Sequence, residues 1–105
     1  MSKKIIQLST KQCSPCQRLR QEIEAVIDKT PYEYEYISLY NGVDKDDLSF
    51  TYDNYWSEIN SNIIKYREQY GVRFFSFPTI IKQDDDKLEL IDRRYIIKFL
   101  QDESK

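Results

Sequence analysis

The chain carries the stretch Cys13-Ser14-Pro15-Cys16, which contains both of its cysteines and constrains its fold more than any other segment. Two residues separate the cysteines, so a helix that begins here would place the second sulfur about one turn along, close enough to form a small disulfide ring. Pro15 suits such a beginning, because the first turn of a helix does not need the N–H that proline lacks. The motif is therefore expected at the N-terminal end of a helix.

The residues on either side of the motif predict a strand before it and a helix after it. Residues 4–8 (KIIQL) are rich in strand-forming side chains, and the polar residues 9–12 read as a loop. After the motif, apolar residues recur at helical spacing, at Leu19, Ile23, Val26 and Ile27. This amphipathic helix should end before Pro31, because the residue preceding a proline disfavours the helical conformation.

The middle of the chain predicts a second strand and a second helix. Residues 32–40 alternate and favour a strand, and the charges of Glu33 and Glu35 on one face indicate a sheet edge. Asn41-Gly42 predicts a turn and residues 44–47 an acidic loop. Residues 52–70 are mainly helical in pattern and end at Gly71, a suitable C-cap. The beginning of this helix stays open, because Phe50, Tyr52, Tyr55 and Trp56 form an aromatic segment of ambiguous period. One face of this helix carries Ile59, Ile63, Tyr66 and Tyr70.

The last third predicts a hairpin and a final helix. Residues 79–82 and 88–91 read as strands joined by a polar turn over 83–87. Asp92 is a suitable N-cap for the last helix. The predicted buried stripe of that helix consists of Tyr95, Ile96, Phe99 and Leu100.

These elements follow the order β-α-β-α-β-β-α in a single domain spanning residues 1–105, an α/β fold with a central mixed sheet flanked by helices. The opening strand–helix–strand unit implies a parallel pair with a right-handed crossover. The late hairpin adds antiparallel strands at the other edge. No internal repeat or linker divides the chain.

Composition excludes several kinds of chemistry. The chain has no histidine, so Ser-His, Cys-His and His-metal sites cannot be built. Two cysteines cannot supply a four-cysteine zinc site within one chain. The formal net charge of −2 gives no general electrostatic basis for binding nucleic acid or anionic membranes. No segment reads as a signal peptide or a membrane span, so we expect a cytoplasmic protein.

The cysteine motif at a helix N-terminus predicts thiol–disulfide exchange. Free N–H groups and the helix dipole stabilise a thiolate at the first cysteine. Cys13 would then attack a target disulfide as the nucleophile, and Cys16 would resolve the mixed disulfide. Lys11 and Arg18 are candidates for adding positive potential near the thiolate.

The whole pattern resembles the thioredoxin/glutaredoxin superfamily. The resemblance rests on the motif within its strand–helix–strand frame, on Phe77-Pro78-Thr79 before a hairpin and final helix, and on Tyr-Gly-Val-Arg at residues 70–73. It implies a cis peptide bond before Pro78, facing the cysteines, and a substrate strand paired with the backbone of Phe77. The implied substrate-binding residues are Ser14, Pro15, Phe77, Pro78 and Thr79.

The chain also departs from both branches of that superfamily. The tryptophan that precedes the first cysteine in thioredoxins is here Gln12, and the buried aspartate six residues before that cysteine is here Gln7. The second change removes the expected proton acceptor near Cys16. The size resembles that of a glutaredoxin, yet residues 88–93 lack the Gly-Gly and Asp with which glutaredoxins bind glutathione.

The resemblance implies a small thiol–disulfide oxidoreductase, an electron-transport protein that reduces protein disulfides, with ribonucleotide reductase as a plausible client. Glutathione and a thioredoxin reductase both stay open as the electron donor. We expect no tightly bound cofactor, no metal, no nucleic-acid or membrane partner, and a monomer. Two alternatives compete with this function. One is a redox-inactive module that docks a partner through the aromatic segment 50–56, and the other is a metal or cluster site shared by two chains.

Overall fold

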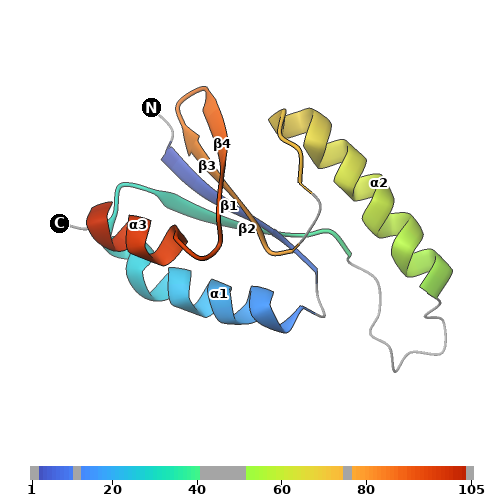
Figure 1. Cartoon of the computed structure of the whole chain (residues 1–105), viewed down its shortest axis with the longest axis horizontal. Helices are drawn as coiled ribbons and strands as arrows, with labels where there is room; N and C mark the ends of the chain where they lie inside the picture. Colours follow the sequence, from blue (N-terminus) through green and yellow to red (C-terminus); the bar gives the residue numbers. More distant parts are fainter. Residues whose placement is uncertain (1–2, 11–12, 41–51, 75–76, 104–105) are drawn as a thin grey trace.

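The computed structural model describes residues 3–10, 13–40, 52–74 and 77–103. Figure 1 shows its strands forming a sheet with α1 and α3 on one side and α2 on the other. The predicted order of strands and helices is confirmed, with a short 3₁₀ helix added after the first α-helix. The elements are β1 (Lys3–Ser9), α1 (Ser14–Val26), η1 (Ile27–Lys29), β2 (Glu33–Ser38), α2 (Tyr52–Tyr70), β3 (Thr79–Asp84), β4 (Lys87–Ile91) and α3 (Ile96–Glu103).

The four strands form one mixed sheet in the order β2-β1-β3-β4. Strand β1 runs parallel to β2 and antiparallel to β3, and β3 runs antiparallel to β4. The parallel first pair and the late hairpin therefore agree with the sequence prediction. Glu33 and Glu35 lie exposed on β2, which is an edge strand, so their predicted edge position is confirmed as well.

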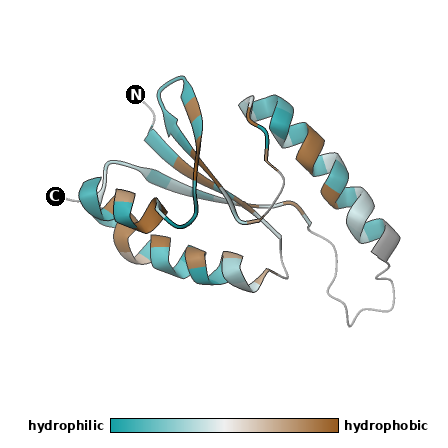
Figure 2. Cartoon of the chain, viewed as in Figure 1, coloured by the Kyte–Doolittle hydropathy of each residue, from teal (hydrophilic) through white to brown (hydrophobic). Residues whose placement is uncertain are grey.

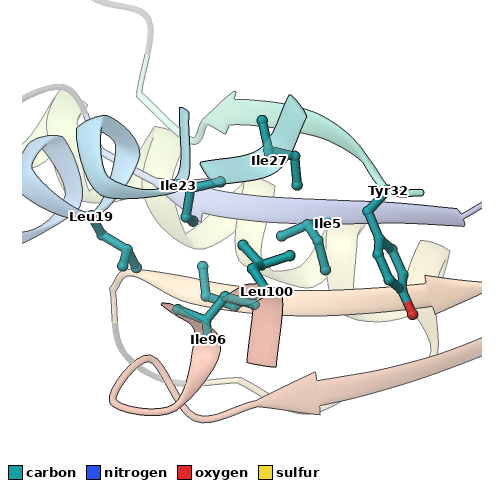
Figure 3. Packing of buried hydrophobic residues seen from close by; sticks show 8 residues of the cluster. Ile5, Leu19, Ile23, Ile27, Tyr32, Ile96 and Leu100 are labelled. Atoms are coloured by element: carbon teal, nitrogen blue, oxygen red, sulfur yellow. The ribbon is translucent and has the colours of Figure 1, made fainter. Parts of the chain in front are cut away.

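Successive residues of β1 serve opposite layers of the core, because side chains alternate across a strand. Ile5 packs with α1 and α3, as the close-up in Figure 3 shows, whereas Ile6 and Leu8 pack beneath α2. Both faces of the strand are covered, so every residue from 5 to 10 is buried. Figure 2 shows hydrophobic residues along the central strands and recurring in α1 and α3 between hydrophilic ones.

Helix α2 is attached to the sheet by apolar packing and by two polar contacts. Ile59 is buried against the second core cluster. Asn62 donates from Nδ2 to the carbonyl of Leu39 at 2.6 Å, and Arg67 donates from Nε and Nη2 to the carbonyl of Phe74 at 3.0 and 2.6 Å. The second contact connects α2 to the segment that leads toward Pro78.

Gly71 ends α2 as predicted. Its φ of +66° lies in the left-handed region, which glycine adopts without steric cost, and its N–H donates to the carbonyl of Arg67 at 2.9 Å.

The hairpin turn is shorter than the polar run 83–87 suggested. Strand β3 continues to Asp84 and β4 begins at Lys87, which leaves only Asp85 and Asp86 in the turn. Asp85 has a φ of +56°, a conformation that aspartate tolerates better than most residues. The cross-strand ion pair of Lys82 and Glu89, at 2.7 Å, adds to the pairing of the extended strands. The run of polar residues therefore predicted the position of the turn correctly but made the turn too long.

The beginning of the last helix was also predicted wrongly. Asp92 does not cap α3. Its Oδ1 accepts from the N–H of Arg94 at 2.8 Å and its carbonyl accepts from the N–H of Tyr95 at 2.9 Å, which closes a separate turn before the helix. This turn directs Tyr95 outward, with 59 % of its surface exposed, so it does not join the buried stripe. Ile96 and Leu100 are buried as predicted.

Several sequence predictions fall outside the described residues. They are the turn at Asn41-Gly42, the acidic loop 44–47, Lys11, Gln12, and residues 50–51 of the aromatic segment. Within the described part of the chain, no helix has the length and apolar character needed to cross a membrane.

The contact between α1 and α3 should contribute measurably to stability. Leu100 is fully buried there, beside Ile23 and Ile5. We expect Leu100→Ala to lower the free energy of unfolding by about 2–5 kcal/mol, because it removes buried apolar surface and leaves a cavity. Urea unfolding of the oxidised protein measures this. The neighbouring exposed Gln101→Ala serves as control and should change stability by less than about 0.5 kcal/mol. Equal effects of the two variants would contradict the assignment of this core.

Candidate active site

Cys13 and Cys16 form a disulfide at the N-terminal end of α1. Their Cα atoms lie 5.1 Å apart. Pro15 occupies the first turn of the helix, as the sequence predicted. The motif thus sits directly after β1 and its short loop, at the end of the strand that runs through the middle of the sheet.

Cys13 is the N-cap residue of α1, and its sulfur takes part in the cap. The backbone N–H of Cys16 donates to Sγ of Cys13 at 3.2 Å. The same N–H would stabilise a thiolate on Cys13 after reduction, together with the positive end of the helix dipole. No acidic residue lies in the first turn of α1 to oppose this effect. The backbone at this helix terminus therefore offers a hydrogen-bond donor to the sulfur of the first cysteine.

The two sulfurs differ in access. Cys13 is partly exposed, whereas Cys16 is completely buried. An external disulfide can therefore be approached by Cys13 and not by Cys16. The roles of nucleophile for Cys13 and resolving thiol for Cys16 stay predictions, which would use this difference in access.

Gln7 lies beneath the motif and is fully buried, at the position for which the sequence had lost a carboxylate. Its Nε2 donates to the carbonyl of Cys16 and to Oγ of Ser9, each at 2.9 Å. Its Oε1 accepts from the hydroxyl of Tyr34 on β2. Gln7 thus joins β1, β2 and the first turn of α1 through one amide. Burial also raises the pKa of Tyr34 well above its ordinary value, so this hydroxyl stays protonated as the donor.

Pro78 follows a cis peptide bond after Phe77, as the resemblance implied. Pro78 and Thr79 are buried, and Thr79 begins β3 opposite Leu8 of β1. Phe77 is half-buried and packs edge-on against Phe74, with ring centroids 6.4 Å apart. This register brings the Phe77–Thr79 segment to the end of the sheet where β1 finishes at Ser9.

A hollow of about 190 Å³ lies between the N-terminal half of α1 and this proline. It is bounded by both Pro15 and Pro78. The structure therefore brings together residues of the two segments to which the family resemblance assigned substrate binding. Ser14 is exposed within the motif but does not line this hollow.

The sequence did not identify Arg93 as part of this region. Its Nη1 donates to the carbonyl of Phe77 at 3.1 Å, and its side chain lines the same hollow as Pro15. Nothing local in the sequence marks this residue, because its placement depends on the register of the hairpin and on the turn at Asp92. Arg94 binds the carboxylate of Asp92, and this hydrogen bonding lowers the pKa of Asp92 to about 2.

Tyr55 and Trp56, the described aromatic side chains of the segment 50–56, differ in their packing. Tyr55 contacts Tyr40 edge-on, with ring centroids 4.7 Å apart, and also contacts Trp56 at 5.1 Å. Trp56 itself exposes 54 % of its surface. Packing therefore accounts for Tyr55 but not for Trp56. Among the described residues, no group of three or more cysteine, histidine or acidic side chains is placed to hold a metal ion.

No protein-family model and no curated protein sequence matches the chain. Solved structures do match it over nearly its whole length. The germline-specific thioredoxin Deadhead from Drosophila melanogaster superposes with a TM-score of 0.60 at 12 % identity, covering 96 % of this chain and 80 % of its own. A mutant thioredoxin from Halobacterium salinarum gives 0.59 at 16 % identity, covering 99 % and 76 %. The exposed lipoprotein thioredoxin of Streptococcus pneumoniae gives 0.51 at 18 % identity, covering 96 % and 84 %. The chain therefore has the thioredoxin-like fold.

The buried amide of Gln7 should be worth more to stability than a surface glutamine. We expect Gln7→Leu to lower the free energy of unfolding by about 2–4 kcal/mol, because it leaves the Cys16 carbonyl and the Tyr34 hydroxyl without their partner. Gln17→Leu is the matched control, since that amide donates to Tyr36 at the surface and its loss should cost less than about 0.5 kcal/mol. Denaturant unfolding of both oxidised variants measures the difference, and a Gln7→Leu protein as stable as the wild type would contradict the network.

Tyr34 should also make the protein sensitive to alkaline pH. Burial raises its pKa in the folded state, whereas the pKa of a tyrosine in the unfolded chain is about 10. The resulting stability is fully present below that pH and is lost as the pH rises above it, because the unfolded chain then releases the proton first. Between about pH 10 and 11.5 we expect Tyr34→Phe to lose stability less steeply than the wild type. Parallel curves in isothermal urea titrations would show that Tyr34 is not shielded.

Proposed function

We propose that the chain is a thiol–disulfide oxidoreductase that reduces protein disulfides through Cys13 and Cys16. The observation that carries this proposal is the asymmetric cysteine pair, in which a partly exposed, helix-capping Cys13 is bonded to a fully buried Cys16. The thioredoxin-like fold and the cis-proline segment beside the motif support it.

The reaction that fits this geometry has two exchange steps. The thiolate of reduced Cys13 attacks one sulfur of the client disulfide, which forms a mixed disulfide and releases the other client sulfur as a thiolate. The thiolate of Cys16 then attacks Sγ of Cys13, which releases the second client sulfur and leaves the Cys13–Cys16 disulfide. The client gains two electrons and, on protonation, two thiols. Backbone groups around Phe77, Pro78 and Thr79, with Ser14 and Pro15, would hold the client segment.

Regeneration requires two electrons from a thiol donor. Two molecules of glutathione or the dithiol of a thioredoxin reductase would supply them, and we include both in the proposal. We further propose a monomer that acts in the cytoplasm, where such a pair is kept reduced, with ribonucleotide reductase among its clients.

The proposal is tested by equilibrating the protein with graded glutathione redox buffers, trapping thiols by alkylation and reading masses. We expect a two-electron transition to an intramolecular disulfide in the range of about −270 to −200 mV. In addition, Cys16→Ser should accumulate a mixed disulfide with a disulfide-containing reporter protein, whereas the matched Cys13→Ser should not. Absence of an intramolecular disulfide in every buffer would refute the oxidoreductase function.

A second function is favoured by one observation, the exposed Trp56 beside the packed Tyr55. In this alternative the chain is a docking module that binds a partner through the aromatic segment 50–56, and the cysteines are dispensable. The Cys13→Ser/Cys16→Ser double variant separates the two functions. It would retain the biological activity of a docking module and lose that of an oxidoreductase.

A further inference from the structure

A larger groove of about 560 Å³ adjoins the hollow beside the cysteine motif. Pro78 and Arg93 line both, so together they form one continuous surface that runs from Pro15 past the cis-proline to the end of β4. A client segment that reaches Cys13 and lies along Pro78 would pass over this surface. Its chemistry therefore bears on which clients the proposed oxidoreductase selects.

This surface, which we call the arginine groove, is rich in cations. Its charged lining residues are Arg18, Arg73, Arg93, Arg94, Glu22 and Asp92. Arg94 is paired with Asp92 at 2.7 Å, so these two charges compensate each other. Within the described part of the chain, neither Arg18 nor Arg73 belongs to an ion pair. The groove therefore carries a surplus of positive charge, although the whole chain has a formal net charge of −2.

Arg93 is held in place at the point where the two hollows meet. One N–H of its guanidinium donates to the carbonyl of Phe77, directly before Pro78. A guanidinium has five N–H donors in a fixed plane, so most of them are left to bind another acceptor. Carboxylates are the acceptors that this planar donor group matches best, often with two parallel hydrogen bonds. Because this hydrogen bond already holds the Arg93 guanidinium, its side chain would lose little conformational entropy on binding an acidic side chain near the reacting disulfide.

We propose that the arginine groove selects clients with acidic residues next to the target cysteine. This inference rests on the proposed function, since it names the class of protein disulfide that the site would reduce. The carboxylates of the client would face Arg93 and Arg18 while its disulfide meets Cys13. The groove charge would also speed the encounter with acidic segments, an effect that salt weakens.

The test uses reduced wild-type protein and two synthetic peptides with the same intramolecular disulfide. Glutamates flank one cysteine in the first peptide, and glutamines replace them in the second. The second-order rate constant of peptide reduction is measured by quenching and mass spectrometry at low salt. We expect the acidic peptide to react about tenfold faster and this ratio to fall toward one at high salt. A ratio near one at low salt would overturn the inference.

Two variants locate the effect. Arg93→Gln and Arg18→Gln should each lower the ratio of the acidic to the neutral rate by about threefold. Arg20→Gln is the matched control, because it removes the same charge from α1 at a site where the arginine pairs with Glu24 and stacks on Tyr36. Its ratio should equal that of the wild type. If Arg20→Gln lowers the ratio as much as Arg18→Gln, the preference is a general charge effect and the groove assignment is wrong.

The experiment also separates this inference from the proposed function. Reduction of both peptides at equal rates would refute the acidic preference and leave the oxidoreductase intact. Reduction of neither peptide, with no Cys13–Cys16 disulfide in the redox buffers, would refute the oxidoreductase and with it this inference.

Discussion

The buried amide of Gln7 is the contact on which the geometry of the motif depends. Cys13 is the N-cap of α1, which follows β1 in the chain. The position of α1 relative to the sheet therefore decides where Cys13 faces. Gln7 fixes that position from below, because it binds the carbonyl of Cys16 and the hydroxyl of Tyr34 at once. A neutral amide can do this at any ordinary pH, whereas a buried carboxylate would change its charge as its proton came and went. The chain therefore gains a fixed support and gives up a buried base.

Gln7 holds the motif in place but carries no charge, so the proposed thiol chemistry depends on the N-terminal end of α1. Cys13 caps α1 with its own sulfur, so the group that stabilises a thiolate is the backbone N–H of Cys16. This arrangement requires no histidine and no buried acid, which agrees with a sequence that has neither at the site. Complete burial of Cys16 then imposes an order on the two sulfurs. In the proposed reaction, the helix terminus and the burial of Cys16 would therefore make Cys13 the first sulfur to meet a large substrate.

Much of this could be predicted from the sequence because the decisive signals are local. The later turns of helix α2 follow from the periodicity of its apolar residues, and its glycine cap follows from one conformational requirement. Its beginning did not follow from the sequence, because the aromatic segment 50–56 has an ambiguous period. The errors arose where tertiary contacts override local preference. The side chain of Asp92 bonds within its own turn instead of capping α3, and this turn leaves Tyr95 outside the core. Likewise, Gln7 could be recognised as the loss of an acid, but its three hydrogen bonds join residues from three elements and have no sequence signature.

The positive charge of the arginine groove could not be predicted from the composition of the chain. A formal net charge of −2 describes the chain as a whole and predicts little about any one surface. Arg18 in α1 and Arg93 after β4 are far apart in sequence, yet they line one hollow. The sheet brings them together, because β3 pairs with β1 and β4 pairs with β3. Two acidic residues, Glu22 and Asp92, line the same surface, and Asp92 is paired with Arg94. Other described acidic residues lie away from it, with Glu33 and Glu35 on the opposite edge strand and Asp85 at the hairpin tip. The fold therefore gathers a surplus of arginines beside the cis-proline, although the charges of the whole chain nearly cancel. At that place the identity of a bound client segment would matter most.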